Sequence, residues 1–331
     1  MYRVNRRGLF GFLAAALVVL GLGFAGCTPA PDPWKEAKPG QKHVLATFPP
    51  LYCLAHAVAG DDAYVLCFLS SQDPHQYAFN PQDAVKAQGA NLIVSNGLEL
   101  DVFVDKLIAG KKIALVRAED VIPKDKLFDA EEDEHDKKDA KQEGHHHHGS
   151  HDPHVWLGPP RAIEIADGIA KKLAEIDSAH ADGYKKRAVA LKADLEKLQE
   201  EGKAKLGKGK TKLKVVSMHD SMRYFADAFD IEIVDVIEEL PGQDPDAKKL
   251  ADLVTTCKEK GVHVITYERQ YSESQPKLLQ KALKSRGVDV QLIEFDPIET
   301  APVGKDGVNP DPDYYMKKMR ANVEALAKAL P

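Results

Sequence analysis

The sequence predicts an α/β protein with two parallel-sheet lobes, joined by a long helix and enclosing a cleft. Short apolar segments alternate with helical patterns before residue 158, and the same alternation returns after residue 212. Such alternation is typical of parallel sheets. Between the two runs lies a helical stretch of about 27 residues, which would span roughly 40 Å. That length suits a strut between two lobes.

The first 26 residues have the three parts of an export signal. Basic residues come first, an uncharged apolar run covers 9–24, and small residues precede Cys27. The run is short for a membrane span, which needs about 20 residues. Phe-Ala-Gly-Cys resembles a bacterial lipobox, so Cys27 is the expected lipidation site, and Pro-rich residues 27–41 are an expected tether. An uncleaved anchor helix is the alternative, and Sec and twin-arginine export both stay open.

The first lobe is expected over residues 42–158. Proline is favoured in the first turn of a helix, so Pro49-Pro50 and Asn80-Pro81 mark helix starts, and another helix is expected near 102–108. Strands are predicted at 43–48, 63–69, 92–95 and 112–117.

A helical segment is expected over 159–211 and the second lobe over 212–331. The helix at about 180–206 has apolar residues spaced near 3.6, namely Tyr184, Val189, Leu191, Leu195 and Leu198. In the second lobe, strands are predicted at 213–218, 232–237, 262–267 and 288–295, with helices ending at 229 and covering 246–260, 274–286 and 313–330.

An acidic and histidine-rich loop is expected over 129–151, inside the first lobe. Residues 129–152 contain nine acids and three lysines, which accounts for the whole formal net charge of −6. The loop has too few apolar residues to bury a core, so it is expected to be mobile. Because imidazole is a common metal ligand, the loop is also expected to collect a transition metal. The alternative is a solvated loop with chance histidines. Its histidines are His135, His145, His146, His147, His148 and His151. Outside this loop the acidic and basic residues are equal in number, and this lack of net positive charge argues against nucleic acid as a partner.

Four potential metal ligands stand where predicted strands end: His75, His154, His219 and Asp296. Ligands of open parallel sheets gather beyond the carboxyl ends of the strands, and facing lobes would bring two of these residues to each side of a cleft. Three imidazoles and a carboxylate suit tetrahedral zinc. Four other histidines are interpreted as ordinary core or surface residues: His43, His56, His180 and His263.

A ligating imidazole usually donates its outer N–H to a carboxylate. The candidates are Asp73, Asp152, Asp220 and Glu268. Beyond Cys27, the cysteines are Cys53, Cys67 and Cys257, none in a Cys-x-x-Cys spacing, which argues against a zinc–thiolate site. A Cys53–Cys67 disulfide is compatible with export and stays open.

Four short motifs together resemble the solute-binding lipoproteins of zinc and manganese ABC importers. They are Gln-Asp-Pro-His-Gln-Tyr at 72–77 followed by Asn80-Pro81, Asp-Pro-His-Val-Trp-Leu at 152–157, His219-Asp220 with Tyr224-Phe225, and Glu-Phe-Asp-Pro at 294–297. The resemblance implies a rigid helix between two lobes, a metal held by His75, His154, His219 and Asp296, and delivery to a membrane permease driven by an ATPase. A histidine at 219 and a histidine-rich loop are typical of the zinc members.

The sequence therefore predicts a monomeric, extracytoplasmic, high-affinity zinc receptor, not an enzyme, at the periplasm or cell surface. A manganese or iron receptor of the same fold is the first alternative. A zinc hydrolase is the second, although the sequence has no His-Glu-x-x-His and no nucleophile elbow. An adhesin or a periplasmic metal buffer without a transporter is the third.

Overall fold

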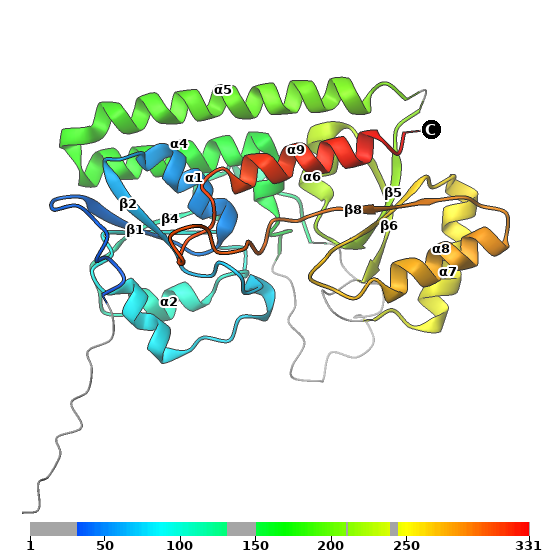
Figure 1. Cartoon of the computed structure of the whole chain (residues 1–331), viewed down its shortest axis with the longest axis horizontal. Helices are drawn as coiled ribbons and strands as arrows, with labels where there is room; N and C mark the ends of the chain where they lie inside the picture. The colour runs from blue at the N-terminus through cyan, green and yellow to red at the C-terminus, as the bar shows by residue number, and fades with distance from the viewer. Residues whose placement is uncertain (1–31, 131–149, 210, 239–243, 331) are drawn as a thin grey trace, which may run out of the picture. The chain divides into compact units, whose positions relative to one another are not determined.

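Two four-stranded parallel sheets with helices around them make up this computed structural model (Figure 1). It describes residues 32–130, 150–209, 211–238 and 244–330. The chain divides into a unit over residues 1–32 and a unit over residues 33–331, and the second contains every element described below. The predicted export signal, Cys27 and the first part of the tether lie outside the described residues, as does most of the acidic and histidine-rich loop. In the described part of the chain, no helix combines the length and apolar character needed to cross a membrane.

The first sheet has the strand order β2-β1-β3-β4, with every neighbouring pair parallel. Its strands are β1 (Lys42–Ala46), β2 (Ala63–Cys67), β3 (Leu92–Ser95) and β4 (Ala114–Arg117). The α-helices of this lobe are α1 (Pro49–Ala59), α2 (Phe103–Ile108) and α3 (Ala118–Val121). Its 3-10 helices are η1 (Pro74–Gln76), η2 (Pro81–Ala87), η3 (Lys124–Lys126) and η4 (Val155–Leu157). Helix α1 begins at the predicted Pro-Pro pair because proline fixes a helical φ and needs no N–H partner there.

The second sheet repeats the first, with the order β6-β5-β7-β8 and parallel pairing throughout. Its strands are β5 (Lys214–His219), β6 (Glu232–Glu238), β7 (Val264–Tyr267) and β8 (Gln291–Glu294). Its helices are α6 (Arg223–Phe229), α7 (Ala247–Lys260), α8 (Ser274–Ser285) and α9 (Tyr314–Ala327). In both sheets the first strand along the chain lies between the second and third, which confirms the predicted repeated design.

Helix α5 (Ala181–Leu206) is the predicted strut and follows α4 (Pro159–Ile176) and η5 (Ser178–His180). Near its start, Arg187 pairs with Asp62 at 2.6 Å and donates to carbonyls at the end of α1. Near its end, Gly202 packs so closely on Phe229 of α6 that a Cβ atom would overlap the ring. The helix is therefore fixed to both lobes, and Figure 1 shows it running along them.

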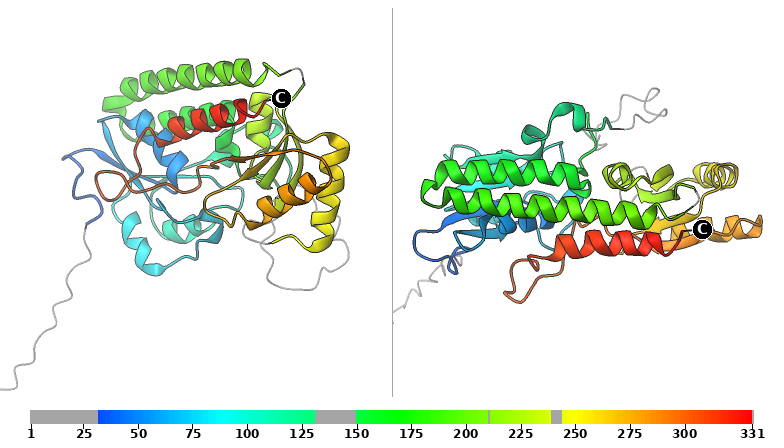
Figure 2. Two further views of the ribbon diagram at one scale, coloured as in Figure 1. Left: turned by 45° about the vertical axis from the view of Figure 1, so that its right-hand side comes forward. Right: turned by 90° about the horizontal axis from the view of Figure 1, so that it is seen from above.

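The buried face of α5 matches the predicted spacing except at one position. Tyr184, Leu191, Leu195 and Leu198 are buried, whereas Val189 is 67% exposed. Ala188 takes the buried position instead, since consecutive helical residues point about 100° apart. Seen from above, α4, α5 and α9 lie side by side (Figure 2).

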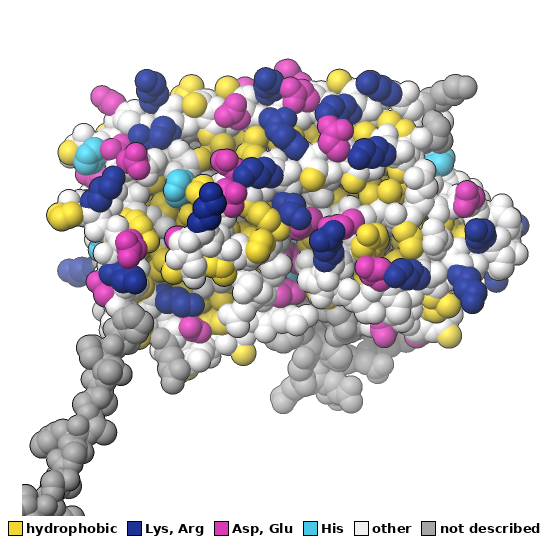
Figure 3. All heavy atoms as spheres, viewed as in Figure 1, with side chains coloured by type: hydrophobic (Ala, Val, Ile, Leu, Met, Phe, Trp, Pro, Cys, Tyr) yellow, Lys and Arg dark blue, Asp and Glu magenta, His cyan; other side chains and the backbone are white. Residues whose placement is uncertain are grey.

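Two apolar cores result. The larger runs from the first sheet through α4 and α5 to α6 and α9. The smaller lies on the other face of the second sheet, under α7 and α8. Consecutive strand residues point to opposite faces, so Val215 belongs to the larger core and Val216 to the smaller. On the face drawn in Figure 3, acidic and basic side chains are interspersed.

Candidate metal centre

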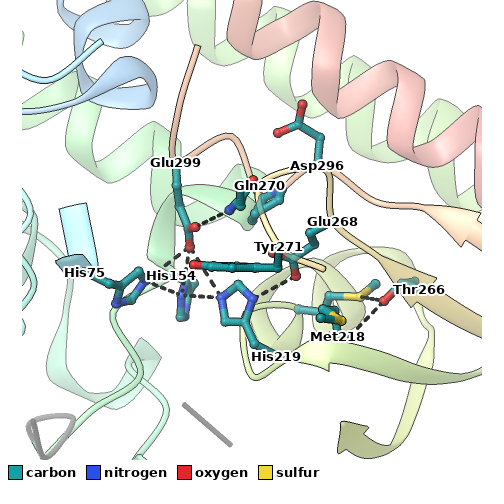
Figure 4. Close-up of polar contacts among 12 residues, drawn as sticks. His75, His154, Met218, His219, Thr266, Glu268, Gln270, Tyr271, Asp296 and Glu299 are labelled. Carbon is teal, nitrogen blue, oxygen red and sulfur yellow. Dashed lines mark hydrogen bonds and ion pairs between the residues drawn. The ribbon is translucent and has the colours of Figure 1, made fainter. Parts of the chain in front are cut away.

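Four ligand-type side chains meet between the carboxyl ends of the two sheets: His75, His154, His219 and Glu299. Their ligand atoms all lie within 4.8 Å of one another. The side chains of His154, His219 and Glu299 are at most 1% exposed and that of His75 is 11% exposed. Figure 4 shows the three imidazoles and the carboxylate pointing toward one another.

The spacing of these atoms fits a tetrahedral zinc ion. The Nε2 atom of His154 lies 3.2 Å from that of His75 and 3.4 Å from that of His219. Glu299 Oε1 lies 3.2, 3.3 and 3.4 Å from the Nε2 atoms of His75, His154 and His219. Zinc bonds of about 2.0–2.1 Å in a tetrahedron would place the ligand atoms roughly 3.3–3.4 Å apart. The donor set and these five distances therefore agree with zinc.

His75 is positioned by the aspartate two residues before it. Asp73 is the N-cap of η1, and its Oδ1 accepts the backbone N–H of His75 at 2.8 Å. Its Oδ2 accepts the hydroxyl of Tyr271 at 2.7 Å. Because Tyr271 follows β7, this bond connects the first-lobe ligand loop to the second lobe.

His154 is held by a second Asp-Pro-His turn. Asp152 Oδ1 accepts both the backbone N–H of His154 at 2.9 Å and its Nδ1–H at 2.8 Å. That bond places the proton on Nδ1 and leaves Nε2 free for a metal. Asn96 at the end of β3 donates to Pro153 O at 2.9 Å, and Trp156 donates to Pro297 O at 2.7 Å. The turn is thus attached to the first sheet and to the Glu299 segment.

His219 is the last residue of β5, and its Nδ1–H donates to Glu268 Oε1 at 2.8 Å. Glu268 follows β7, the neighbour of β5 in the sheet, so parallel pairing brings the two side chains together. Both are buried. Glu299 receives a comparable partner, since its Oε2 accepts a hydrogen bond from Gln270 Nε2 at 2.7 Å.

The prediction of Asp296 as the fourth member of the cluster differs from the structure, which places Glu299 there. Asp296 Oδ1 accepts the backbone N–H of Ile298 at 2.8 Å, and its Oδ2 pairs with Lys318 at 2.6 Å. Figure 4 shows its carboxylate turned away from the histidines. Asp296 caps its own turn with one carboxylate oxygen, and the other oxygen is paired with Lys318.

One sequence feature would have indicated Glu299. Asp73 and Asp152 cap the residue two positions later, and Asp296 does the same for Ile298. Interpreting these three Asp-Pro pairs as caps leaves Glu299 as the next carboxylate after Asp296. Ile298 has φ +65°, an uncommon backbone conformation for a β-branched residue, immediately before this glutamate.

The other predicted residues are divided. Asp152 and Glu268 each accept a ring N–H of a histidine, whereas Asp73 accepts only the backbone N–H of His75. Asp220 instead lines a cavity of about 370 Å³ on the second lobe, together with Arg223 and Asp235. Sequence reasoning missed Gln270 and Tyr271, which have no motif and lie in the loop after β7.

The predicted collector loop is described only at its base. Asp129 and His151 form an isolated antiparallel bridge, so the two ends of the loop are adjacent. The remaining loop histidines fall outside the described residues: His135, His145, His146, His147 and His148. The described cysteines, Cys53, Cys67 and Cys257, are buried free thiols. His43 stacks on Trp34 and His180 contacts Asp177, so these two histidines lie outside the cluster.

Two histidines of the cluster, His154 and His219, hold protons more tightly than ordinary histidines do. Burial alone would lower the pKa of His154, but hydrogen bonds with Asp152 and Glu299 outweigh it and raise that pKa to about 9. Burial is likewise outweighed at His219, whose pKa is raised by Glu268 and Glu299. The histidines in turn outweigh burial at Glu299 and hold its pKa well below the usual range. A binding metal must therefore displace protons.

Comparison with known proteins agrees with this geometry. Residues 44–329 match the family described as zinc-uptake complex component A, periplasmic. The zinc-binding lipoprotein AdcA of Streptococcus pneumoniae (strain ATCC BAA-255 / R6) is 29% identical over 87% of this chain and 55% of its own length. The chain thus spans about half the length of that relative. The high-affinity zinc uptake system protein ZnuA of Bacillus subtilis (strain 168) is 27% identical over 98% of this chain and 97% of its own.

Solved structures share the fold. The laminin-binding protein Lmb of Streptococcus agalactiae, described as an adhesin with metal-transporting activity, superposes with a TM-score of 0.69 at 26% identity, covering 88% of this chain and 100% of its own. The Mn²⁺ complex of FpvC from Pseudomonas aeruginosa gives a TM-score of 0.71 at 22% identity, covering 88% and 98%. The predicted two-lobe fold and the family resemblance are both confirmed. With its match across 44–329, this chain belongs to the family of periplasmic zinc-uptake components.

Proposed function

We propose that this protein is an extracytoplasmic receptor that binds zinc with high affinity and delivers it to an ABC importer. The observation that carries this proposal is the ligand spacing of 3.2–3.4 Å from Glu299 Oε1 to three imidazole nitrogens, and from the His154 nitrogen to the other two. Two relatives are named for zinc binding and zinc uptake, which supports zinc as the cargo. A manganese or iron receptor of the same fold is the alternative.

The proposed ligands are His75, His154, His219 and Glu299. Four protein ligands leave zinc no open coordination position, which is typical of storage or structural sites and unlike catalytic zinc. This supports a receptor over a hydrolase, as does the family's description by zinc uptake. His75 is the most exposed of the four ligands, so it marks the side from which zinc enters and leaves.

The proposal also includes the histidine-rich loop and the lipid anchor. The loop over 129–151 would collect zinc through weak imidazole contacts before transfer to the cluster. Cys27 would carry the lipid that anchors the monomeric receptor beside a permease and its ATPase. The same proposal includes the predicted division of the chain into an export signal, a tether, a first lobe, a helical segment and a second lobe, with boundaries after residues 26, 41, 158 and 211.

The test is metal content and chelator competition on the full chain in detergent, compared with a variant lacking residues 131–149. That deletion keeps the Asp129–His151 bridge at the base of the loop. One tightly held zinc in both forms, with further weak zinc in the intact chain, is the expected result. Manganese or iron in the tight site would overturn the cargo. No tight metal after the deletion would make the loop the main site.

A hydrolase would be revealed by turnover. The zinc-loaded chain should show no zinc-dependent hydrolysis of ester or phosphate substrates, because its four protein ligands leave no position for an attacking water. Hydrolysis that disappears in a Glu299→Ala variant would contradict the receptor assignment.

A further inference from the structure

The two carboxylate oxygens of Glu299 have different partners. Oε1 faces the three histidine nitrogens at 3.2–3.4 Å. Oε2 accepts a hydrogen bond from Gln270 Nε2 at 2.7 Å (Figure 4). The Glu299 side chain is fully buried, so water does not compete for either oxygen. One oxygen is thus available to a cation while the other is occupied by the protein.

The number of oxygens that a carboxylate offers affects which cation it suits. A carboxylate that binds through both oxygens raises the coordination number, as in calcium sites, and oxygen-rich octahedral sites suit Mg²⁺, Ca²⁺ and Mn²⁺. Zinc prefers four ligands in a tetrahedron. A group that occupies Oε2 therefore favours zinc over a cation that requires more ligands.

Gln270 is held so that its amide N–H faces Glu299. It lies in the loop between β7 and α8, flanked by two residues with partners of their own. Glu268 accepts the His219 Nδ1–H at 2.8 Å, and the Tyr271 hydroxyl donates to Asp73 at 2.7 Å. A carboxylate can only accept, so the amide must present nitrogen and not oxygen toward Oε2.

We propose that Gln270 is a specificity-determining residue, which holds Glu299 to one ligand oxygen and so selects four-coordinate zinc against manganese. This inference rests on the proposed zinc receptor function. It adds a residue that does not touch the metal itself and that acts through Glu299. Glutamine suits this role because it reaches the carboxylate, donates an N–H and adds no charge to the ligand cluster.

The test replaces the donor while keeping the length of the side chain. In Gln270→Met the N–H is lost, and Oε2 becomes free to bind a metal. Zinc affinity should fall about tenfold, the effect of losing one hydrogen bond to a charged group. Mn²⁺ affinity should hold or rise, so the ratio of zinc to manganese affinity should fall by about tenfold or more. Both affinities are measured by chelator competition on the full chain in detergent.

A spectroscopic measurement separates changed coordination from general damage. Co²⁺ bound to the wild-type chain should show the strong visible absorption of a tetrahedral site. In Gln270→Met that absorption should weaken as the coordination number rises. The matched control is Tyr271→Phe, which loses a hydrogen bond from the same loop but none to Glu299. It should weaken zinc and manganese by the same factor and keep the Co²⁺ spectrum.

Several results would overturn the inference. An unchanged affinity ratio with an unchanged Co²⁺ spectrum in Gln270→Met would reduce Gln270 to a packing residue. An equal loss for every metal would do the same. Gln270→Leu provides a second variant that lacks the donor and adds no charge, and it must also lower the ratio. Failure of the wild-type chain to bind zinc tightly would instead overturn the receptor proposal, and it would be seen before any variant is compared.

Discussion

In the first lobe His75 and His154 are each held by the aspartate two residues earlier, whereas in the second lobe His219 and Glu299 depend on partners far along the chain. Asp73 and Asp152 accept the histidine backbone N–H at 2.8 and 2.9 Å. Glu268 is 49 residues from His219, and Gln270 is 29 residues from Glu299. The first lobe thus encodes its ligands in a local turn, and the second builds them by folding its sheet.

The first prediction concerns which second-lobe carboxylate binds zinc, Glu299 or Asp296. Glu299→Ala removes a proposed ligand, so zinc affinity should fall by more than about a hundredfold, beyond the effect of losing an outer partner. Asp296→Asn keeps the acceptor for the Ile298 N–H and should bind zinc nearly as tightly as the wild type. Chelator competition measures both. A large loss in Asp296→Asn with normal binding by Glu299→Ala would restore the original assignment.

That assignment shows how far sequence could predict the site. His75, His154 and their aspartates were predictable because the Asp-Pro-His turn is a local motif that occurs twice in the sequence. His219 was predictable as a polar residue closing an apolar strand. Asp296 was chosen for the same reason, although it caps a turn and pairs with Lys318 on α9. That contact forms only once α9 packs, so the strand pattern could not exclude it.

The fold itself was largely predictable. The eight strands, α1, α4 and α5 follow from apolar periodicity and from proline and glycine at their ends. Gln270 and Tyr271 were not predictable, because the sequence of a polar loop after a strand does not indicate its tertiary hydrogen-bond partners. Folding of the second lobe brings Glu299 to Gln270, and the packing of one lobe against the other brings Asp73 to Tyr271.

A second prediction separates the charge of the Asp152 carboxylate from its role as a hydrogen-bond acceptor. Asp152 holds both the backbone and the ring of His154. Asp152→Asn keeps an acceptor oxygen and should weaken zinc binding about tenfold, whereas Asp152→Ala loses both bonds and should weaken it about a hundredfold. Glu268→Gln is the second-lobe counterpart and should resemble Asp152→Asn. Equal losses in both Asp152 variants would show that the carboxylate charge, and not the acceptor oxygen, carries the effect.

A ligand from each lobe should lose its proton when zinc binds, because the pKa values of His154 and His219 are both raised. The proton leaves His154 only as pH rises through about 9, so it competes with zinc below that pH. Apparent zinc affinity should therefore rise from pH 7 to pH 9, by up to about tenfold per pH unit for each proton displaced. Calorimetry in buffers of different ionisation enthalpy counts the released protons. A flat profile over this range would contradict the raised pKa values.

The smallest effect concerns the strut and acts on stability. Gly202→Ala places a methyl group against Phe229, and such overpacking should lower the free energy of unfolding by about 1–3 kcal/mol. Val189→Ala on the exposed face of the same helix should stay within about 0.5 kcal/mol. Urea unfolding of the metal-free chain measures both. A neutral Gly202→Ala would mean that α5 is not tightly packed on the second lobe.

The division of the apolar interior into two cores has a consequence for how the protein opens. The larger core joins the first sheet to α6 and α9, so those parts are expected to unfold as one cooperative unit. The smaller core lies under α7 and α8 and forms a separate unit of fewer residues, which can open alone at a lower free-energy cost. The loop carrying Glu268, Gln270 and Tyr271 leads into α8, at the edge of that smaller unit. Local unfolding there would release the partners of His219 and Glu299 while the strut and the first sheet stay folded, so the ligand cluster could loosen without separation of the lobes.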